Sequence, residues 1–212
     1  SGGVHSGDST MVLPPYDLPR RVVEEAMEIA EVLNEALRIR GPYNVQFLYH
    51  RDRVYVVELN LRASRSMPFT SKVTGVDLME LAARAVLDGG LEITGGGFKL
   101  LEARAWGVKS PQFSWSRLRG AYPHLGPEMR STGEAAALGR TLEEAFLKSW
   151  LGICGNRLPE PCEVILVYDP TYRSKCLERA ALSFSEAGLE VLTVDSMEVP
   201  GAESVRAEEV LE

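Results

Sequence analysis

The stretch GPYNVQFLYHRDRVYVVELNLR, residues 41–62, decides the fold of the first part of this chain. Two apolar-rich runs, YNVQFLYH (43–50) and VYVVELN (54–60), are joined by the short polar segment Arg51-Asp52-Arg53. Runs rich in Val, Phe and Tyr on either side of a short turn are typical of a β-hairpin. The sequence therefore predicts two antiparallel strands at this position.

The two faces of this hairpin differ because side chains alternate across a strand. With the turn centred on Asp52, Gln46 lies opposite Glu58 and Asn44 lies opposite Asn60. One face then carries the polar residues Asn44, Gln46, Glu58, Asn60 and, one step further, Arg62. The other face is the expected core side and carries Val45, Phe47, Tyr49, Tyr55, Val57 and Leu59.

Amide and carboxylate oxygens followed by an arginine are groups that can bind a cation and a phosphate. Hard cations such as Mg²⁺ take oxygen ligands and share phosphate oxygens, and the planar fork of an arginine matches a phosphate. One interpretation is therefore a magnesium–nucleotide site on the sheet. The alternative is an ordinary solvated sheet face, because polar residues alternate with apolar ones in any half-buried strand.

The segments around the hairpin are expected to be helical or irregular. Apolar residues recur every three or four positions before it, which predicts an amphipathic helix that starts at Pro19 and runs to about Arg40. Residues 63–76 are expected to be irregular, and residues 77–88 to form a second helix.

A second group of strands is expected further along. The glycines at 95–97 predict a turn, FKLLEARAWGV (98–108) a strand, residues 110–130 an ordered loop, and STGEAAALG (131–139) a short strand. Thr141 and Glu144 then have the spacing of a capping box, which predicts a helix that runs through Trp150.

The last part of the chain changes in character after a linker. EVILVY (163–168) and LEVLTV (189–194) are predicted strands, and apolar residues at helical spacing over 176–187 lie between them. This order is typical of a βαβ unit with a parallel sheet. The predicted fold class is therefore α+β, followed by a partial α/β unit.

Composition excludes several function classes. The chain has 23 Lys and Arg against 30 Asp and Glu, so its formal net charge is −7. That balance argues against a nucleic-acid partner, because a phosphate footprint needs a basic excess. We expect no membrane partner either, since no apolar run approaches the roughly 18–20 residues of a membrane helix. Three cysteines without metal-type spacing favour a reducing, cytoplasmic location.

Five motifs resemble the large subunit of carbamoyl phosphate synthetase. They are GVHSGDS (3–9), GPYNVQF (41–47), VVELNLRASRSMPFTSKVTGVDL (56–78), SPQFSWSRLRGA (110–121) and LGPEMRSTGE (125–134). The resemblance implies the closing part of the second ATP-grasp unit over residues 1–155 and a linker at 156–161. Residues 162–212 resemble the start of a methylglyoxal-synthase-like regulatory domain. Their loop TVDSMEVPG (193–201) lacks the small, threonine-rich composition that binds effector phosphates in the family.

The resemblance also implies roles for individual residues. Mg²⁺ or Mn²⁺ would be held by Gln46, Glu58 and Asn60. ATP would contact Gly3, Val4, His5, Ser6, Gln46 and Glu58. Arg62 would be catalytic and face the phosphates, and Asp8 and Glu102 lie near positions that bind an allosteric amine in some bacterial members.

The implied reaction is phosphorylation of carbamate to carbamoyl phosphate. The parent enzyme uses bicarbonate, glutamine-derived ammonia and two ATP, and it feeds pyrimidine and arginine synthesis. Its implied partners are the upstream ATP-grasp lobe, the first synthetase half and the small glutamine amidotransferase subunit. We expect the isolated chain to be inactive, because no glycine-rich phosphate loop with a following basic residue and helix is present. Two alternatives are another ATP-grasp carboxylate–amine ligase and a catalytically silent regulatory or assembly fragment.

Overall fold

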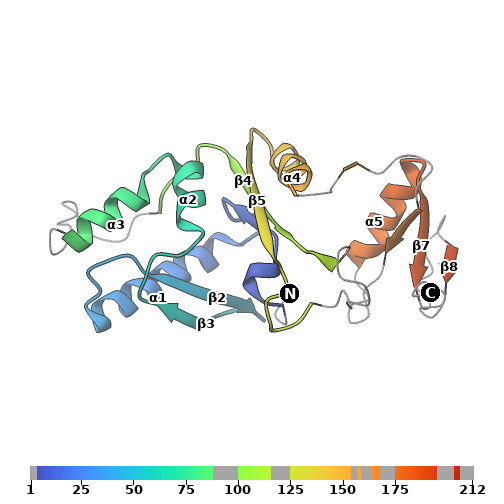
Figure 1. Cartoon of the computed structure of the whole chain (residues 1–212). Coiled ribbons are helices and arrows are strands. Elements are labelled where there is room, and N and C mark those ends of the chain that lie inside the picture. The colour runs from blue at the N-terminus through green and yellow to red at the C-terminus, as the bar shows by residue number, and fades with distance from the viewer. Residues whose placement is uncertain are drawn as a thin grey trace. The chain divides into compact units, whose positions relative to one another are not determined.

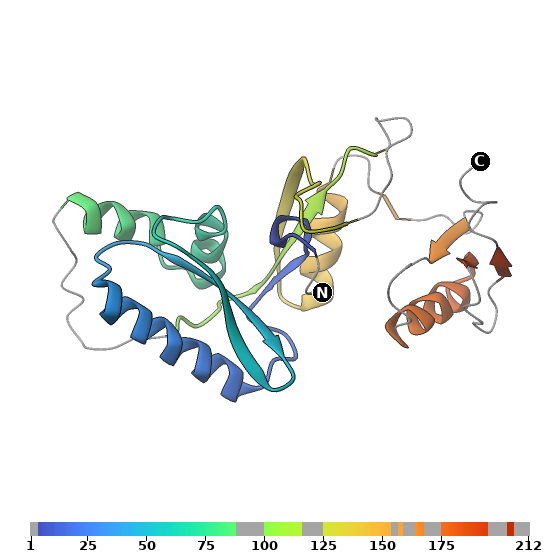
Figure 2. The same ribbon diagram turned by 90° about the horizontal axis from the view of Figure 1, so that it is seen from below.

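The computed structural model describes residues 4–87, 100–115, 125–153, 157–158, 164–167, 175–194 and 203–205. The chain divides into two compact units, Ser1–Asn156 and Arg157–Glu212. Figures 1 and 2 show the elements of both units from two directions. Each unit is described by itself.

An antiparallel sheet organises one half of the first unit. Its strands are β1 (Met11–Leu13), β4 (Trp106–Gln112) and β5 (Gly133–Gly139), in the order β1-β4-β5. Helix α4 (Leu142–Leu151) packs on β4 and β5 (Figure 1). The helix approaches β5 closely at Gly139, where an added Cβ would lie only 2.5 Å from the backbone nitrogen of Ala145.

The start of α4 confirms the predicted capping box. Oγ1 of Thr141 accepts a hydrogen bond from the Glu144 N–H at 3.2 Å. Glu144 also reaches back, but its carboxylate accepts from the N–H of Arg140 at 2.7 Å instead of the N–H of Thr141. Both bonds satisfy amides near the helix start, which intrahelical bonds leave open.

The hairpin forms the other half of the first unit. Strands β2 (Asn44–His50) and β3 (Arg53–Asn60) pair antiparallel, and α1 (Arg20–Leu37) packs on them (Figure 2). The turn has two residues, Arg51 and Asp52, both with positive φ. Such a turn matches the twist of paired strands, so Arg53 belongs to the strand and not to the turn.

Helix α1 is slightly shorter than predicted. Pro19 is its N-cap and not its first residue, and the helix ends at Leu37 instead of near Arg40. Arg38 adopts a left-handed conformation with φ of 49°, and its N–H donates to the carbonyls of Asn34 and Glu35. This backbone reversal stops the helix before Gly41.

The prediction of irregular structure at 63–76 is wrong, because α2 (Met67–Thr74) lies there. Pro68 stands in its first turn and Gly75, with φ of 73°, caps its end. Hydroxyls on the helix bond to carbonyls one turn back, for example Thr74 to Thr70 at 2.9 Å. Ser and Thr have low helix propensity, so tertiary packing sustains this helix.

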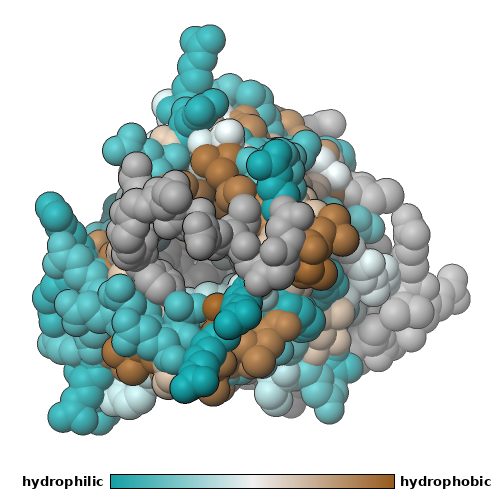
Figure 3. Space-filling view, turned by 90° about the vertical axis from the view of Figure 1, so that its left-hand side faces the viewer, coloured by the Kyte–Doolittle hydropathy of each residue, from teal (hydrophilic) through white to brown (hydrophobic). Residues whose placement is uncertain are grey.

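The prediction of the next helix is confirmed over α3 (Leu78–Leu87). The Asp77 carboxylate accepts from the N–H groups of Met79 and Glu80 and so caps it. Figure 3 looks at the molecule from the α3 side, where apolar side chains lie among polar ones. The exposed apolar residues of α3 are Met79, Leu81, Val86 and Leu87.

Strand β4 begins and ends later in the sequence than predicted. The strand occupies 106–112, whereas 98–108 was expected and 110–130 was assigned to a loop. Residues 100–105 do not form a strand, and 110–112 do. The expected glycine turn at 95–97 lies outside the described residues.

The core of the first unit lies where α2 and α4 meet β4. The buried apolar side chains there are Phe69, Val73, Val108, Ala145 and Ile153. A Cβ at Gly107 would stand 2.4 Å from Val73 and 2.7 Å from Phe69. The missing side chain of Gly107 therefore lets α2 approach the strand. β5 at 133–139 matches its predicted position.

The second unit contains the predicted parallel arrangement. Strands β6 (Val164–Val167) and β7 (Glu190–Val194) pair in parallel, and α5 (Lys175–Glu186) lies between them in sequence. A further strand, β8 (Glu203–Val205), pairs parallel with β7 and was not predicted. Among the described residues, the buried apolar side chains of this second unit are Ala181, Leu189 and Val191. No helix in the described parts of the chain is long and apolar enough to cross a lipid bilayer.

Candidate nucleotide and metal site

The register of the hairpin confirms the predicted pairing of its polar residues. Gln46 lies opposite Glu58, and Asn44 lies opposite Asn60. Nδ2 of Asn60 donates to Oε1 of Glu58 at 3.1 Å. Glu58 is exposed, whereas Gln46 and Asn60 are half-buried. These side chains thus form one polar cluster on an open sheet face.

A β-bulge corrects the predicted register on the tip side of this cluster. Phe47 pairs with Val56 and not Val57, so Tyr55 lies opposite Leu48 instead of Tyr49. Tyr55 therefore faces the polar side, and Val57 is an extra residue. Both are exposed, at 44% and 54% respectively. The predicted core role of these two side chains is wrong because the extra residue shifts the alternation of β3.

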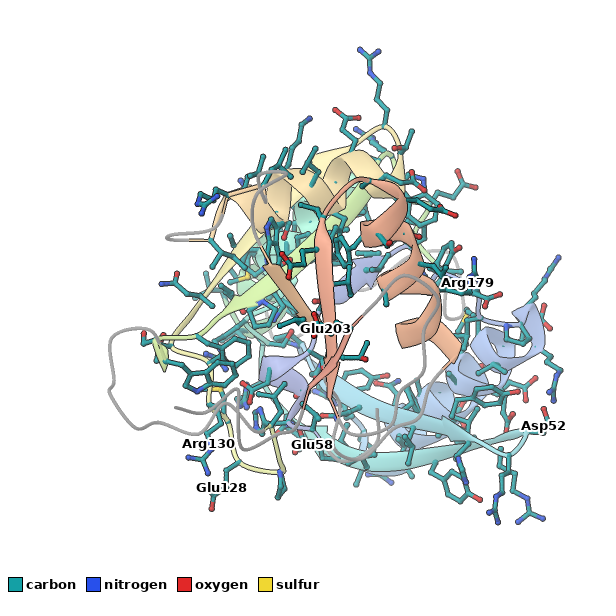
Figure 4. All side chains as sticks on the ribbon, turned by 90° about the vertical axis from the view of Figure 1, so that its right-hand side faces the viewer. Asp52, Glu58, Glu128, Arg130, Arg179 and Glu203 are labelled. Carbon is teal, nitrogen blue, oxygen red and sulfur yellow. The ribbon has the colours of Figure 1, made fainter. Side chains whose placement is uncertain are left out.

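Helix α1 covers the opposite face and holds the hairpin at two points. The Tyr43 hydroxyl donates to the Ala30 carbonyl at 3.1 Å. At the tip, Arg21 of α1 forms an ion pair with Asp52, and the Tyr49 hydroxyl donates to the same carboxylate at 2.8 Å. The bond from Tyr49, followed by that from Arg21, lowers the pKa of Asp52. Figure 4 labels Asp52 at the tip and Glu58 further along the hairpin.

The donor set fits Mg²⁺ or Mn²⁺. Gln46 and Asn60 offer amide oxygens and Glu58 offers a carboxylate, the ligands that hard cations prefer. Among the described residues, no group of three His, Cys, Asp or Glu side chains gathers to form a different metal site. The hairpin cluster relies on amides and a single acid, so it suits a cation that also takes oxygens from a phosphate.

Arg62 does not continue the strand as expected. β3 ends at Asn60, and Arg62 lies in an exposed bend where its Nη1 donates to the Ala63 carbonyl at 3.3 Å.

Of the predicted nucleotide contacts, Gln46 and Glu58 lie on the hairpin, whereas Val4, His5 and Ser6 lie on a different element. His5 is the N-cap of a single turn, η1 (Ser6–Asp8), which contacts β4. Val4 and His5 are half-buried and Ser6 is exposed. Gly3 lies outside the described residues. Among the described residues, no hydrogen bond or ion pair in the structure joins this turn to the hairpin cluster.

Sequence reasoning missed the contacts that hold this turn. Asp8 is buried, and its two carboxylate oxygens accept from the N–H groups of Arg130 and Ser131 at 2.8 and 2.9 Å. Figure 4 labels Glu128 and Arg130 on this segment. Both segments fall in the quoted motifs GVHSGDS and LGPEMRSTGE, which was the available signal. Glu102, grouped with Asp8 in the sequence analysis, is exposed.

Comparison with known proteins finds a family match and a similar fold. Residues 1–94 match the family described as the ATP binding domain of the carbamoyl-phosphate synthase L chain. In structure, the urea carboxylase of Kluyveromyces lactis aligns with 68% of this chain at a TM-score of 0.53, and the alignment covers 15% of that protein. The identity is 18%, so this likeness concerns the fold alone. Fold and matches together define a chain of the ATP-grasp class.

Sequence relatives give the family. The carbamoyl phosphate synthase large chain of Hyperthermus butylicus is 60% identical over 99% of this chain and 20% of its own length. That of Pyrococcus furiosus is 58% identical over 77% of this chain and 15% of its own. The chain belongs to the carbamoyl phosphate synthase large-chain family, which confirms the resemblance. It spans 20% and 15% of the length of these two curated relatives.

Proposed function

We propose that this chain supplies part of the site that phosphorylates carbamate in the second ATP-grasp unit of a carbamoyl phosphate synthase large chain. The observation that carries the proposal is the opposed pair Gln46 and Glu58, with the Asn60 amide bonded to Glu58 on an open face. This cluster lies in a chain 60% identical to a named large chain. Its ligands would be ATP with Mg²⁺ or Mn²⁺.

In the proposed step, a carbamate oxygen attacks the γ-phosphorus of ATP and the bond to the ADP oxygen breaks. Catalysis of such transfers rests on positioning and on neutralising phosphate charge. When bound, the cation would supply that neutralisation at Gln46, Glu58 and Asn60. His5 and Ser6 would bind the nucleotide, and Arg62 would orient the phosphates through its guanidinium.

The partners and context follow from the same proposal. We infer that the rest of the large chain closes over the open hairpin face, and that the small subunit delivers ammonia from glutamine. Residues 162–212 would begin the methylglyoxal-synthase-like domain, in keeping with the parallel strands β6, β7 and β8. The setting would be cytoplasmic, and the product would serve pyrimidine and arginine synthesis.

The reverse reaction tests this function directly. Carbamoyl phosphate and ADP should yield ATP and carbamate in an assembly of this chain with the remaining large-chain parts. Glu58→Gln keeps the shape of the side chain but removes its charge. We expect it to lower the rate about 100-fold or more, as when a group that stabilises transition-state charge is lost.

Two controls frame that test. Glu35→Gln makes the same chemical change at an exposed position of α1 and should leave the rate unchanged. The chain alone should not turn over ATP, because a loose phosphoryl transition state needs donors on several sides. Wild-type ATP formation by the Glu58→Gln assembly would refute the assignment of the hairpin.

A further inference from the structure

The turn that carries His5 is fastened to a segment more than a hundred residues away. The His5 N–H donates to the Gly126 carbonyl at 2.9 Å. The Ser131 hydroxyl donates to the Gly7 carbonyl at 3.3 Å. Together with the two bonds to the Asp8 carboxylate, these contacts join the turn to residues 126–131 at several points.

The hydrogen bonds of this turn define the tautomer of His5. Nδ1 of its imidazole accepts from the Gly7 N–H at 3.0 Å. A ring nitrogen that accepts a hydrogen bond carries no proton, so in this arrangement the neutral ring has its proton on Nε2. Nε2–H is then the group that His5 can offer to a ligand. The ligand atom that meets this N–H group must therefore be a hydrogen-bond acceptor, such as a phosphate or hydroxyl oxygen.

Asp8 directly follows Gly7 in this turn, and its N–H donates to the His5 carbonyl at 2.9 Å. Burial of the Asp8 carboxyl raises its pKa, but hydrogen bonds from the side chain of Ser131 and from the backbone of Arg130 and Ser131 outweigh burial and lower the pKa overall. Asp8 is therefore ionised at neutral pH, and its charged hydrogen bonds are of the stronger kind. It is 4% exposed, so water cannot readily replace these partners.

Steric contact limits the turn on its other side. A Cβ at Gly7 would lie 2.9 Å from Sδ of Met129 and 3.1 Å from Nδ1 of His5. The backbone at Gly7 is thus enclosed between the imidazole and Met129. The His5 ring, the Gly7 backbone and the 126–131 segment form one packed unit in which Asp8 is the buried charged anchor.

We propose that Asp8 is a positioning residue, which holds the turn so that His5 presents a neutral Nε2–H donor to an oxygen atom of the bound nucleotide. This inference rests on the proposed function, because it takes the nucleotide as the ligand of His5. It assigns Asp8 no direct contact with the ligand. Asp8 acts through Gly7 and His5.

Two variants of His5 separate its two nitrogen atoms. His5→Asn keeps a short side chain that can accept from the Gly7 N–H and cap the turn, but it lacks a donor at the reach of Nε2. His5→Gln keeps a donor at about that reach. We expect ADP affinity, measured by equilibrium binding to the assembled large chain, to fall about tenfold in His5→Asn and to be largely restored in His5→Gln. Equal losses in both variants would overturn the donor assignment.

A variant of Asp8 tests its action through His5. Asp8→Asn keeps the shape, but its NH₂ group faces one of the two N–H donors and cannot accept. We expect the KM for ADP in the reverse reaction to rise about tenfold with little change in kcat. Added to His5→Asn, the substitution should raise KM by less than about twofold, because the donor that Asp8 positions is already gone. A merely structural role would instead give effects that multiply.

Further measurements keep the test decisive. If Asp8→Asn does not fold, Ser131→Ala removes the hydroxyl that bonds the Gly7 carbonyl and that also helps to lower the pKa of Asp8, and it should raise KM about twofold to threefold. Unchanged KM in that variant would overturn the proposal, as would unchanged KM in folded Asp8→Asn. Glu58→Gln tests the proposed function through turnover, whereas ADP binding tests the His5 turn without turnover. The two ideas can therefore fail separately.

Discussion

The ion pair between Lys109 and Glu134 predicts a strong asymmetry between its two partners. Nζ of Lys109 lies 2.9 Å from Oε2 of Glu134. The lysine side chain is 7% exposed and the glutamate side chain is 42% exposed. Loss of the glutamate charge would leave a buried ammonium without its counter-charge. Loss of the lysine would leave a carboxylate that water already reaches.

The expected magnitudes follow from this difference. Breaking a fully buried pair by removing one partner costs about 3–5 kcal/mol. Since Glu134 is partly solvated, we expect Glu134→Gln to cost about 2 kcal/mol. Lys109→Met replaces the buried amine with an apolar chain of similar size and should change the free energy of unfolding by less than about 1 kcal/mol. In the double variant, Glu134→Gln should then cost almost nothing further.

Tryptophan fluorescence can follow this unit alone. All three tryptophans, Trp106, Trp115 and Trp150, lie within Ser1–Asn156. For a unit of this size, 1 kcal/mol shifts Tm by about 2–4 °C. We therefore expect a fall of about 4–8 °C for Glu134→Gln and of less than about 4 °C for Lys109→Met. A larger fall for Lys109→Met than for Glu134→Gln would refute the reasoning.

Two other predictions concern close packing and acid stability. Gly139→Ala should cost about 3 kcal/mol and lower Tm by about 6–12 °C, because the new Cβ would meet backbone atoms of α4 that cannot rotate away. Gly126→Ala, which meets no atom within 4 Å, is the matched control and should shift Tm by less than about 2 °C. Folding lowers the pKa of Asp8 from its ordinary value of 3.8, so the ionised carboxylate stabilises the folded state at every pH above that value. This stabilisation is lost as the pH falls through the lowered pKa. Urea unfolding should therefore show the stability gap between wild type and Asp8→Asn shrinking below about pH 4, and a gap that stays constant would contradict the assignment.

The hairpin was predictable because its information is local. Alternation along two short runs was enough to place Gln46 opposite Glu58. The bulge at Val57 was not predictable from alternation, since both Val56 and Val57 are apolar and either could have paired with Phe47. The error affected Tyr55 and Val57 but spared the polar cluster, which lies on the far side of the bulge from the turn.

The errors outside the hairpin arise where packing overrides local preference. Helix α2 is rich in residues that disfavour helices, yet it forms because Phe69 and Val73 pack against the strand at Gly107. Strand β4 continues through Ser110 and Pro111 because β5 pairs with it there. Neither outcome is visible in a pattern confined to the segment itself.

In the candidate site, too, contacts between neighbouring segments were predictable and contacts between segments far apart in sequence were not. The polar cluster lies on neighbouring strands, and its opposed pair was predicted. The contacts of Asp8 join residues 122 and 123 positions apart, and no periodicity reveals such a pair. The resemblance included both motifs, GVHSGDS and LGPEMRSTGE, but it did not show that Asp8 of the first bonds to the backbone of the second.

The two halves of the site also differ in how firmly this chain holds them. The His5 turn is fixed by a buried carboxylate and by backbone bonds, so the proposed His5 donor would be arranged without a nucleotide. The hairpin has α1 on one face only, and its polar face stays exposed at Glu58. Binding a cation there requires further oxygen ligands, which a nucleotide phosphate can provide. Under the proposed function, a nucleotide bound at the His5 turn would supply these oxygens to a cation on the hairpin, and binding of the two ligands would then be mutually dependent.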